Sequence, residues 1–260
     1  MTAILRNEAS RLLRGSLVLT GVFTLLAAMY YPIFPGFAAD AEELEAAFPP
    51  ELMDFFGIEA LDTIEGFIAA EMYSFFWVLL IGIYFAYISA GTIAGDVERR
   101  KMDLTLSNPV SRESVLVQKV LALGVPLIVL NIGVIVINVV GSRLIDEPLS
   151  LTPLLMVHLL SIPYLLVCAG IGLVMSVVMD RARSAQGIAL ILVFTLWLID
   201  SASRLDADYE WIGYLTPSRY YDETAILVRE EFAYFDAAVL TAGFLVLLLL
   251  STALFLRRDI

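Results

Sequence analysis

The feature that most constrains this chain is a set of six long apolar runs that contain no aspartate, glutamate, lysine or arginine. Most of these runs reach the length of about 20 residues with which a helix crosses the hydrocarbon core of a bilayer. Within lipid the backbone must satisfy its own hydrogen bonds, as a helix does within one segment. The sequence therefore predicts an all-α membrane protein with six transmembrane helices, at about 15–34, 72–94, 120–140, 153–179, 184–199 and 237–256.

The composition supports this class and excludes several others. Hydrophobic residues make up 60% of the 260 positions, whereas a soluble domain contains roughly 45–50%. A net charge of −12 argues against nucleic acid as a partner, because its phosphates need a basic surface. One cysteine and one histidine leave no cluster of ligands for a metal site. No internal repeat is evident, so residues 1–260 are expected to form one membrane domain.

Basic residues gather in the segments that this layout places on one side of the bilayer. The positive-inside rule makes that side cytosolic, with both termini, and we expect the plasma membrane as the location. The loop 35–71, with ten acids and no basic residue, is then external. Of the 16 lysines and arginines, 12 fall on the cytosolic side: Arg6, Arg11, Arg14, Arg99, Arg100, Lys101, Arg112, Lys119, Arg181, Arg183, Arg257 and Arg258.

Three segments outside the spans have the pattern of helices that lie on a membrane surface. Residues 1–14 place apolar and basic side chains on opposite helical faces, on the cytosolic side. In the external loop, apolar residues such as Phe48, Leu52 and Phe56 recur at helical spacing. Residues 220–232 form a third candidate, beside an aromatic belt. We therefore expect short interfacial helices at these places.

The connection 91–120 between the second and third runs carries the densest positive charge. Asp96 and Arg100, and again Arg99 and Asp103, are four residues apart, which would pair opposite charges on one helical face. This spacing predicts a short cytosolic helix from Asp96 to Ser107. Pro109 would then begin a second helix that continues through Lys119 into the membrane.

Three groups of residues inside the spans are candidates for packing or function. A stripe of small residues in the second span predicts close approach of another helix, and we expect a dimer contact there: Ala86, Ala90, Gly91, Ala94 and Gly95. Asn131, Asn138 and His158 are expected to point into the bundle, where they could line a pathway. Cys168, Met175 and Met179 share a stripe that could serve a soft metal, although such residues are usually packing material.

The absence of two motifs narrows the choice of function. A phosphate-binding loop needs a lysine directly after a glycine, whereas Lys101 follows Arg100 and Lys119 follows Gln118. The apolar runs also lack the charged residues with which ion-coupled transporters commonly carry protons or sodium. A transporter subunit driven by a separate ATPase fits these absences. A non-catalytic accessory or sensor protein of the membrane remains the alternative.

Three motifs resemble the permeases of type-2 ATP-binding-cassette (ABC-2) exporters. They are LSNPVSR at 106–112 with Lys119 seven residues on, YLTPSRYY at 214–221, and FLRRDI at 255–260. Many members carry Gly-Thr where this chain has Lys101 and Met102, so a different local turn is expected there.

This resemblance implies two permease chains above two copies of a cytosolic ATPase, which holds ATP and Mg²⁺, so that this chain is no enzyme and needs no cofactor. The substrate would be small or amphipathic, and a role in metal-centre maturation is an alternative. The coupling surface would comprise Asp96, Glu98, Arg99, Arg100, Asp103, Ser107, Pro109 and Arg112.

Overall fold

The computed structural model describes residues 3–258, and it contains six helical segments long and apolar enough to cross a membrane. The first two residues of the predicted N-terminal helix and the last two of the C-terminal motif lie outside the described range. The six segments confirm the all-α, six-span prediction, and each extends to within a few residues of a predicted run or beyond it: Ala3–Ala39, Ile64–Glu98, Arg112–Leu144, Leu151–Val178, Ala182–Ser203 and Tyr234–Arg257.

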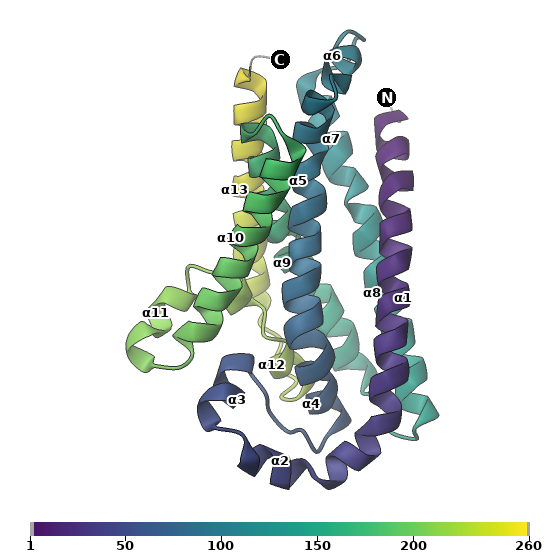
Figure 1. The fold of residues 1–260 in the computed structure, drawn as a ribbon, viewed down its shortest axis with the longest axis vertical. Coiled ribbons are helices and arrows are strands. Elements are labelled where there is room, and N and C mark those ends of the chain that lie inside the picture. Colours follow the sequence, from purple (N-terminus) through teal and green to yellow (C-terminus); the bar gives the residue numbers. More distant parts are fainter. Residues whose placement is uncertain (1–2, 259–260) are drawn as a thin grey trace.

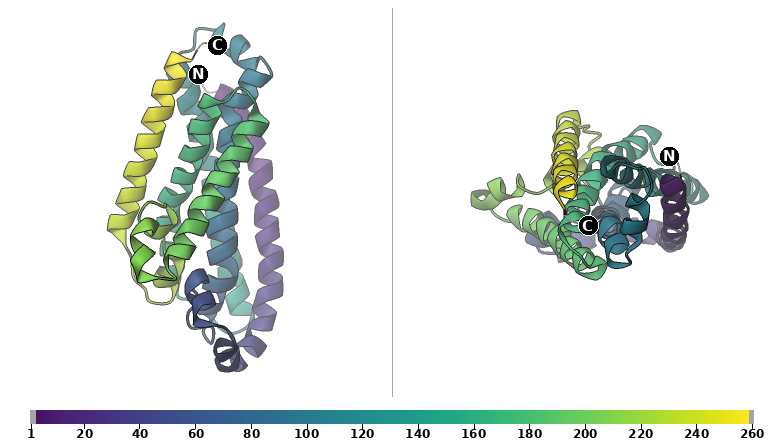
Figure 2. Two further views of the ribbon diagram at one scale, coloured as in Figure 1. Left: turned by 60° about the vertical axis from the view of Figure 1, so that its left-hand side comes forward. Right: turned by 90° about the horizontal axis from the view of Figure 1, so that it is seen from above.

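Both ends of the described chain lie at the same end of the bundle, as six crossings require (Figure 1). We call this the terminal end and the opposite one the distal end. The twelve basic residues counted above belong to segments of the terminal end, whereas Arg143, Arg204, Arg219 and Arg229 belong to the distal end. The helices run side by side along the long axis of the molecule (Figure 2).

The first span, α1 (Ala3–Ala39), is one uninterrupted helix. The prediction of a separate interfacial helix over residues 1–14 is therefore wrong for its described part. Glu8 and Leu12 are buried within the bundle, and no helix-breaking residue separates them from the apolar run that follows. Tertiary contacts thus keep the first turns in line with the first span, although the local amphipathic pattern predicts a helix that lies along the membrane surface.

The second span combines α4 (Ile64–Ile68), the π-helix η1 (Ala69–Ile81) and α5 (Gly82–Glu98). The hydroxyl of Ser74 donates to the carbonyl of Ala69 at 2.9 Å, five residues back, which suits the wider turn. Thr63 caps the start of α4 by accepting a hydrogen bond from the Gly66 amide at 3.1 Å. This span is buried over most of its length and forms the centre of the bundle.

The third span is made of α7 (Arg112–Ala122) and α8 (Gly124–Leu144), which meet at Leu123. The remaining spans are α9 (Leu151–Val178), α10 (Ala182–Ser203) and α13 (Tyr234–Arg257). The most extensive contacts join α9 to α5 and α13, α1 to α8, and α10 to α5. Helix α9 therefore packs against α5, α13 and α10, whereas α1 packs mainly against the third span.

The small-residue stripe of the second span is used inside the chain. Ala86, Ala90 and Ala94 have no exposed surface. A Cβ at Gly172 of α9 would lie 2.1 Å from the Ala86 carbonyl oxygen, so these two backbones touch. A Cβ at Gly91 would lie 2.7 Å from Nε2 of Gln186 on α10. The stripe thus admits a close helix as predicted, and its neighbours here are α9 and α10 of the same chain. Gly91 and Gly95 also line an open cleft, so a dimer contact at these two positions stays a prediction.

At the distal end, α2 (Ala41–Ala47) and α3 (Pro50–Phe56) replace the single amphipathic helix expected in the acidic loop. Pro49 and Pro50 separate them, since proline lacks the amide that a continuing helix needs. Phe48, Leu52 and Phe56 remain exposed, as an interfacial segment requires.

The second distal segment contains η2 (Ala207–Tyr209), α11 (Glu210–Gly213), η3 (Ser218–Tyr220) and α12 (Glu223–Leu227). The predicted surface helix over 220–232 is wrong here, because α12 is short and buried against α9 and η1. The Thr224 hydroxyl donates to the Gly57 carbonyl at 2.9 Å and so joins α12 to the other distal loop. The run Thr-Ala-Ile-Leu at 224–227 is buried on all sides, so it had no amphipathic face to display.

Candidate functional site

The terminal end projects a short helix, α6 (Lys101–Leu106), beyond the end of the second span (Figure 1). The predicted single helix from Asp96 to Ser107 is interrupted, because α5 ends at Glu98 and Arg100 adopts a left-handed conformation with φ of 53°. Left-handed angles cost a residue with a side chain about 1–2 kcal/mol. The expected change of turn therefore falls at Arg100, one residue before Lys101 and Met102.

Asp96 is paired differently from the prediction. Its Oδ2 lies 2.6 Å from Nζ of Lys119, which also contacts Oε1 of Glu8 at 3.0 Å and the carbonyl of Thr92 at 2.9 Å. Lys119 is only 2% exposed. Neither Asp96 with Arg100 nor Arg99 with Asp103 forms an ion pair among residues 3–258. The buried triad of Glu8, Asp96 and Lys119 instead joins α1, α5 and α7.

Sequence reasoning missed this triad, although two signals were present. Lys119 is one of only two lysines in the chain. Glu8 lies three residues after Leu5 and four before Leu12, on the apolar face of the first helix, where a charge needs a partner.

A small hydrophobic cluster, separate from the main core of the bundle, holds α6 against the ends of the spans. It contains Met102, which has no exposed surface, and buried residues from four spans. Its other buried members are Ile93, Val115, Leu116, Leu173, Val177 and Phe255. Because α6 is anchored at Met102, a force on the short helix is transmitted to α5, α7, α9 and α13.

Besides Asp96, two of the predicted coupling residues hold other spans through contacts within the chain. Oε2 of Glu98 accepts a hydrogen bond from the Ala182 amide at 3.0 Å, at the start of α10. The guanidinium of Arg112 donates to the carbonyls of Phe255, at 3.2 Å, and of Arg258, at the end of α13. A carboxylate at a helix N-terminus and a cation at a C-terminus both satisfy free backbone groups. These residues thus tie the spans together at the terminal end.

The other predicted coupling residues form an exposed surface, which we call the tip. Leu104 is 71% exposed at its centre. Ser107 and Asn108 close α6 by donating to the Leu104 carbonyl, and Ser111 begins α7 by capping the Ser114 amide. Helix α7 therefore starts at Arg112, three residues later than a start at Pro109 would give. The tip comprises Arg99, Arg100, Lys101, Asp103, Leu104, Ser107, Asn108 and Pro109.

A cleft with a volume of about 380 Å³ runs between α1, α5 and α10 in the terminal half of the bundle. Its walls combine aromatic residues, Tyr84 and Tyr87, with the polar side chains of Gln186, Arg11 and Arg99. A neighbouring cavity of about 630 Å³ lies between the start of α1 and the tip. The cleft can therefore contact both an apolar body and a polar head of a ligand, and it adjoins the tip through Arg99.

Residues 2–260 match the sequence model of a known family, described as "ABC-2 family transporter protein". This chain belongs to that family. No curated protein matches the chain significantly. As a member of the ABC-2 family, the chain is a component of membrane transport, and the match covers both the tip and the cleft.

The ABC-2 chain buries its predicted pathway residues in a hydrogen-bond network in the distal half of the bundle. Asn138 accepts from the Tyr31 hydroxyl at 2.7 Å and donates to the Tyr73 hydroxyl at 3.2 Å. Tyr73 contacts Nε2 of His158 at 2.8 Å, and Nδ1 of His158 contacts Oδ1 of Asn131 at 3.1 Å. Since an amide oxygen only accepts, Nδ1 carries the proton and Nε2 accepts from Tyr73.

This network confirms that Asn131, Asn138 and His158 point into the bundle. It also provides them with hydrogen-bond partners from α1, η1, α8 and α9. None of the three lines the cleft between α1, α5 and α10. Their assignment to a pathway therefore has no support in this arrangement, which instead holds four helices together.

The cysteine and methionine stripe of this ABC-2 chain behaves as packing material. Cys168 is fully buried, and Met175 and Met179 pack against the same core. Among the described residues, no group of three or more histidine, cysteine or acidic side chains is placed to hold a metal ion.

A polar pocket at the distal end was not anticipated from the sequence. It is a small cavity of about 20 Å³ between α3, η1, α10 and α12. Asp200 is 2% exposed and pairs with Arg204 at 3.0 Å, while its Oδ1 has no hydrogen-bond partner within the described residues. Burial, together with the neighbouring Asp222, raises the pKa of Glu223 from 4.5 to about 7. The only available signal was that Asp200 directly follows an apolar run.

Proposed function

We propose that this chain is the membrane-spanning permease subunit of an ATP-driven ABC-2 exporter. A separate ATPase binds the tip and hydrolyses ATP with Mg²⁺, and a second permease chain, identical or related, completes the transporter. The terminal end faces the cytosol of a cell whose plasma membrane contains the complex. The partition of 12 basic residues to the terminal end and four to the distal end supports this orientation.

The observation that carries the proposal is the way in which the tip is built. Leu104 is exposed on a short helix whose opposite side is anchored by Met102. The triad around Lys119 and the cap by Glu98 fix the same end of α5 to α1, α7 and α10. A soluble partner that moves the tip would therefore move several spans as rigid bodies.

The cleft between α1, α5 and α10 is the proposed substrate pathway. Tyr84 and Tyr87 offer aromatic surface, and Arg11 and Gln186 offer polar groups. This combination suits a small amphipathic molecule, which would enter from the cytosol or the inner leaflet. We propose that the second permease chain closes the open side of the cleft, which Gly91 and Gly95 of the small-residue stripe also line.

The test uses a charge placed at the centre of the tip. Leu104→Glu should leave the protein folded, because Leu104 is mostly solvent-exposed, but should reduce co-purification of the ATPase at least tenfold. The matched control is Leu215→Glu, the same change at a distal leucine that is 73% exposed. An ABC ATPase co-expressed with the tagged permease provides the partner, and the measurement is the amount of ATPase retained on the permease.

Two outcomes would overturn the proposal. Unchanged ATPase retention by Leu104→Glu would support an accessory or sensor protein that has no ATPase on this surface. Equal loss from Leu104→Glu and Leu215→Glu would show a general effect of added charge. Glu98→Lys would be a less clear test of docking, because Glu98 also caps α10.

A further inference from the structure

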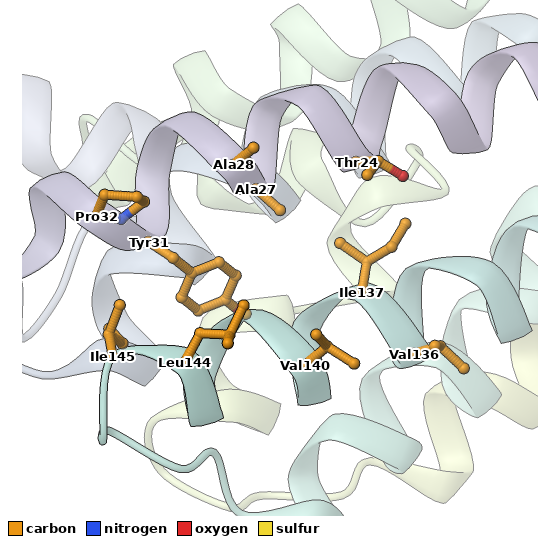
Figure 3. Close-up of a pocket in the computed structure, with 11 residues that line it drawn as sticks. Thr24, Ala27, Ala28, Tyr31, Pro32, Val136, Ile137, Val140, Leu144 and Ile145 are labelled. Carbon is orange, nitrogen blue, oxygen red and sulfur yellow. The ribbon is translucent and has the colours of Figure 1, made fainter.

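A groove lies on the flank of the bundle between α1 and α8, towards the distal end (Figure 3). Its volume of about 310 Å³ is at the lower end of the range of small-ligand pockets, about 300–1,000 Å³. Ala27 and Ala28 form one wall, and Val136, Val140 and Leu144 form the other. Gly141 allows the ring of Tyr31 to approach α8, since a Cβ there would lie 2.3 Å from that ring.

The groove presents only apolar surface, although two of its residues carry hydroxyl groups. The Tyr31 hydroxyl donates to Asn138 at 2.7 Å and faces the interior network. The Thr24 hydroxyl donates to the Thr20 carbonyl of its own helix at 2.9 Å. Because apolar cavities stay dry, water is a poor occupant. A flexible apolar chain is a better one.

Both walls belong to membrane-spanning segments, so the groove opens to lipid. Leu144 is 79% exposed at its rim, which is the side on which hydrocarbon chains lie. The medium around the groove therefore supplies an occupant of the required chemistry without a diffusing ligand.

Arg143 gives the groove a charged end. Val136, Val140 and Arg143 follow one another at helical spacing along one stripe of α8, so Arg143 lies one turn beyond Val140 and next to Leu144, at the distal end of the groove. Arginine side chains near helix ends extend towards the interface while their stems cover apolar surface. A ligand in the groove would thus contact apolar side chains along most of its length and the Arg143 guanidinium at the distal end of the groove.

Arg143 also differs from the other three distal arginines. Each of those forms an ion pair: Arg204 with Asp200, Arg219 with Glu210, and Arg229 with Glu59. Arg143 is exposed and forms none among residues 3–258, although Asp146 and Glu147 follow it closely in the chain. Its charge is therefore available to an anionic group from outside the chain.

We propose that this groove binds one phospholipid, with an acyl chain between α1 and α8 and the phosphate at Arg143. The planar guanidinium can contact two phosphate oxygens at once. An apolar trough that ends at one free cation is complementary to a molecule with a long chain and an anionic head. The bound lipid fills the space beside Tyr31 and adds to the contacts that hold α1 on the third span.

The test measures binding of phosphatidylglycerol to the delipidated, detergent-solubilised chain by native mass spectrometry. Arg143→Gln removes the charge, and Ala28→Trp fills the groove at an exposed position. Each should weaken binding of the first lipid at least tenfold. The matched controls are Arg219→Gln, at a distal arginine that is already paired, and Ala253→Trp, at an exposed alanine of α13. Both controls should bind as the parent does.

Competition identifies the part of the lipid that is recognised. Glycerol phosphate, which has the head but no acyl chain, should fail to displace the bound lipid at concentrations at which phosphatidylglycerol does. Displacement by glycerol phosphate alone would show an ordinary anion site at Arg143 and would overturn the proposal.

Other outcomes also contradict it. Unchanged lipid binding in Arg143→Gln would exclude the phosphate contact, whether or not Ala28→Trp folds. If Ala28→Trp instead reduced self-association, measured by light scattering, and left lipid binding intact, the groove would be an interface between copies of the chain. These measurements require neither the ATPase nor transport, so they are independent of the proposed function.

Discussion

Lys119 shows how much one residue can contribute at the terminal end. Its ammonium is almost fully buried and contacts two carboxylates and one carbonyl from α1 and α5. A buried pair is weak evidence for net stability, because removing charges from water is costly. Removal of Lys119 is different, since it leaves two carboxylates without their shared cation, and of these, within residues 3–258, only Glu8 keeps another, Arg11, at 2.7 Å.

Lys119→Met should therefore lower stability by about 3–5 kcal/mol, the usual cost of breaking a buried ion pair. Thermal unfolding in detergent measures the effect. Lys101→Met, at the exposed lysine of the tip, serves as the control and should change little. Adding Glu8→Gln and Asp96→Asn to Lys119→Met should recover part of the loss. No recovery in the triple variant would mean that packing, and not charge, dominates at this site.

Glu223 is the residue whose charge should respond to pH near neutrality. Burial raises its pKa to about 7, above the 4.5 of an exposed glutamate. The folded state therefore holds the proton more tightly than the unfolded state. The resulting stabilisation is complete below about pH 4.5 and is lost as the pH rises through about 7.

The midpoint of thermal unfolding should fall between pH 5 and pH 8, and Glu223→Gln should reduce that fall. Since one pKa unit corresponds to about 1.4 kcal/mol and Glu223 is partly exposed, we expect an effect of about 1–3 kcal/mol. Glu43→Gln, at an exposed glutamate of α2, is the matched control. A pH profile that is the same for Glu223→Gln and the parent would contradict the assignment.

At the scale of elements, the contact between α5 and α9 organises the bundle. The two helices approach so closely that Gly172 has no room for a side chain beside Ala86. Such contacts between small residues are a general way to pack helices in lipid, where burial of apolar surface gives no advantage.

Gly172→Ala should destabilise the protein by about 1–3 kcal/mol, the range for overpacking. Gly187→Ala in α10 is a matched control, because no atom lies within 4 Å of the added Cβ. In a helix alanine is favoured over glycine by roughly 0.5–1 kcal/mol, so Gly187→Ala should be neutral or stabilising. Equal effects of the two changes, measured by thermal unfolding, would mean that α5 and α9 are not in backbone contact.

At the scale of the whole molecule, the separation of tip and distal loops predicts a topology that labelling can test. Cysteines replacing Asp62 or Asp206, in a background with Cys168→Ala, should react with an impermeant thiol reagent applied to intact cells. A cysteine replacing Asp103 in the tip should react only after the membrane is permeabilised. All three positions are exposed, so burial does not prevent labelling. Reaction at residue 103 in sealed cells would reverse the orientation.

The sequence by itself determined the class, the six spans and the grouping of basic residues at one end. These properties depend on each segment and the bilayer separately, since an apolar run of sufficient length inserts whatever its neighbours are. The pattern of Asn131 and Asn138, seven residues apart, also sufficed to place both inside the bundle. The hydrogen-bond partners of these side chains could not be predicted from their spacing, because they come from other helices.

Only the tertiary structure decided which surfaces the helices use on one another. Lys119 and Glu8 are separated by 111 residues, and no local pattern links them, so the i and i+4 pairing of Asp96 with Arg100 was the natural but incorrect expectation. The small-residue stripe likewise fits any close helix, and only the packed bundle shows that α9 and α10 of the same chain contact it. Short helices such as α12 are buried by neighbours distant in sequence, and therefore their own amphipathicity does not predict their place.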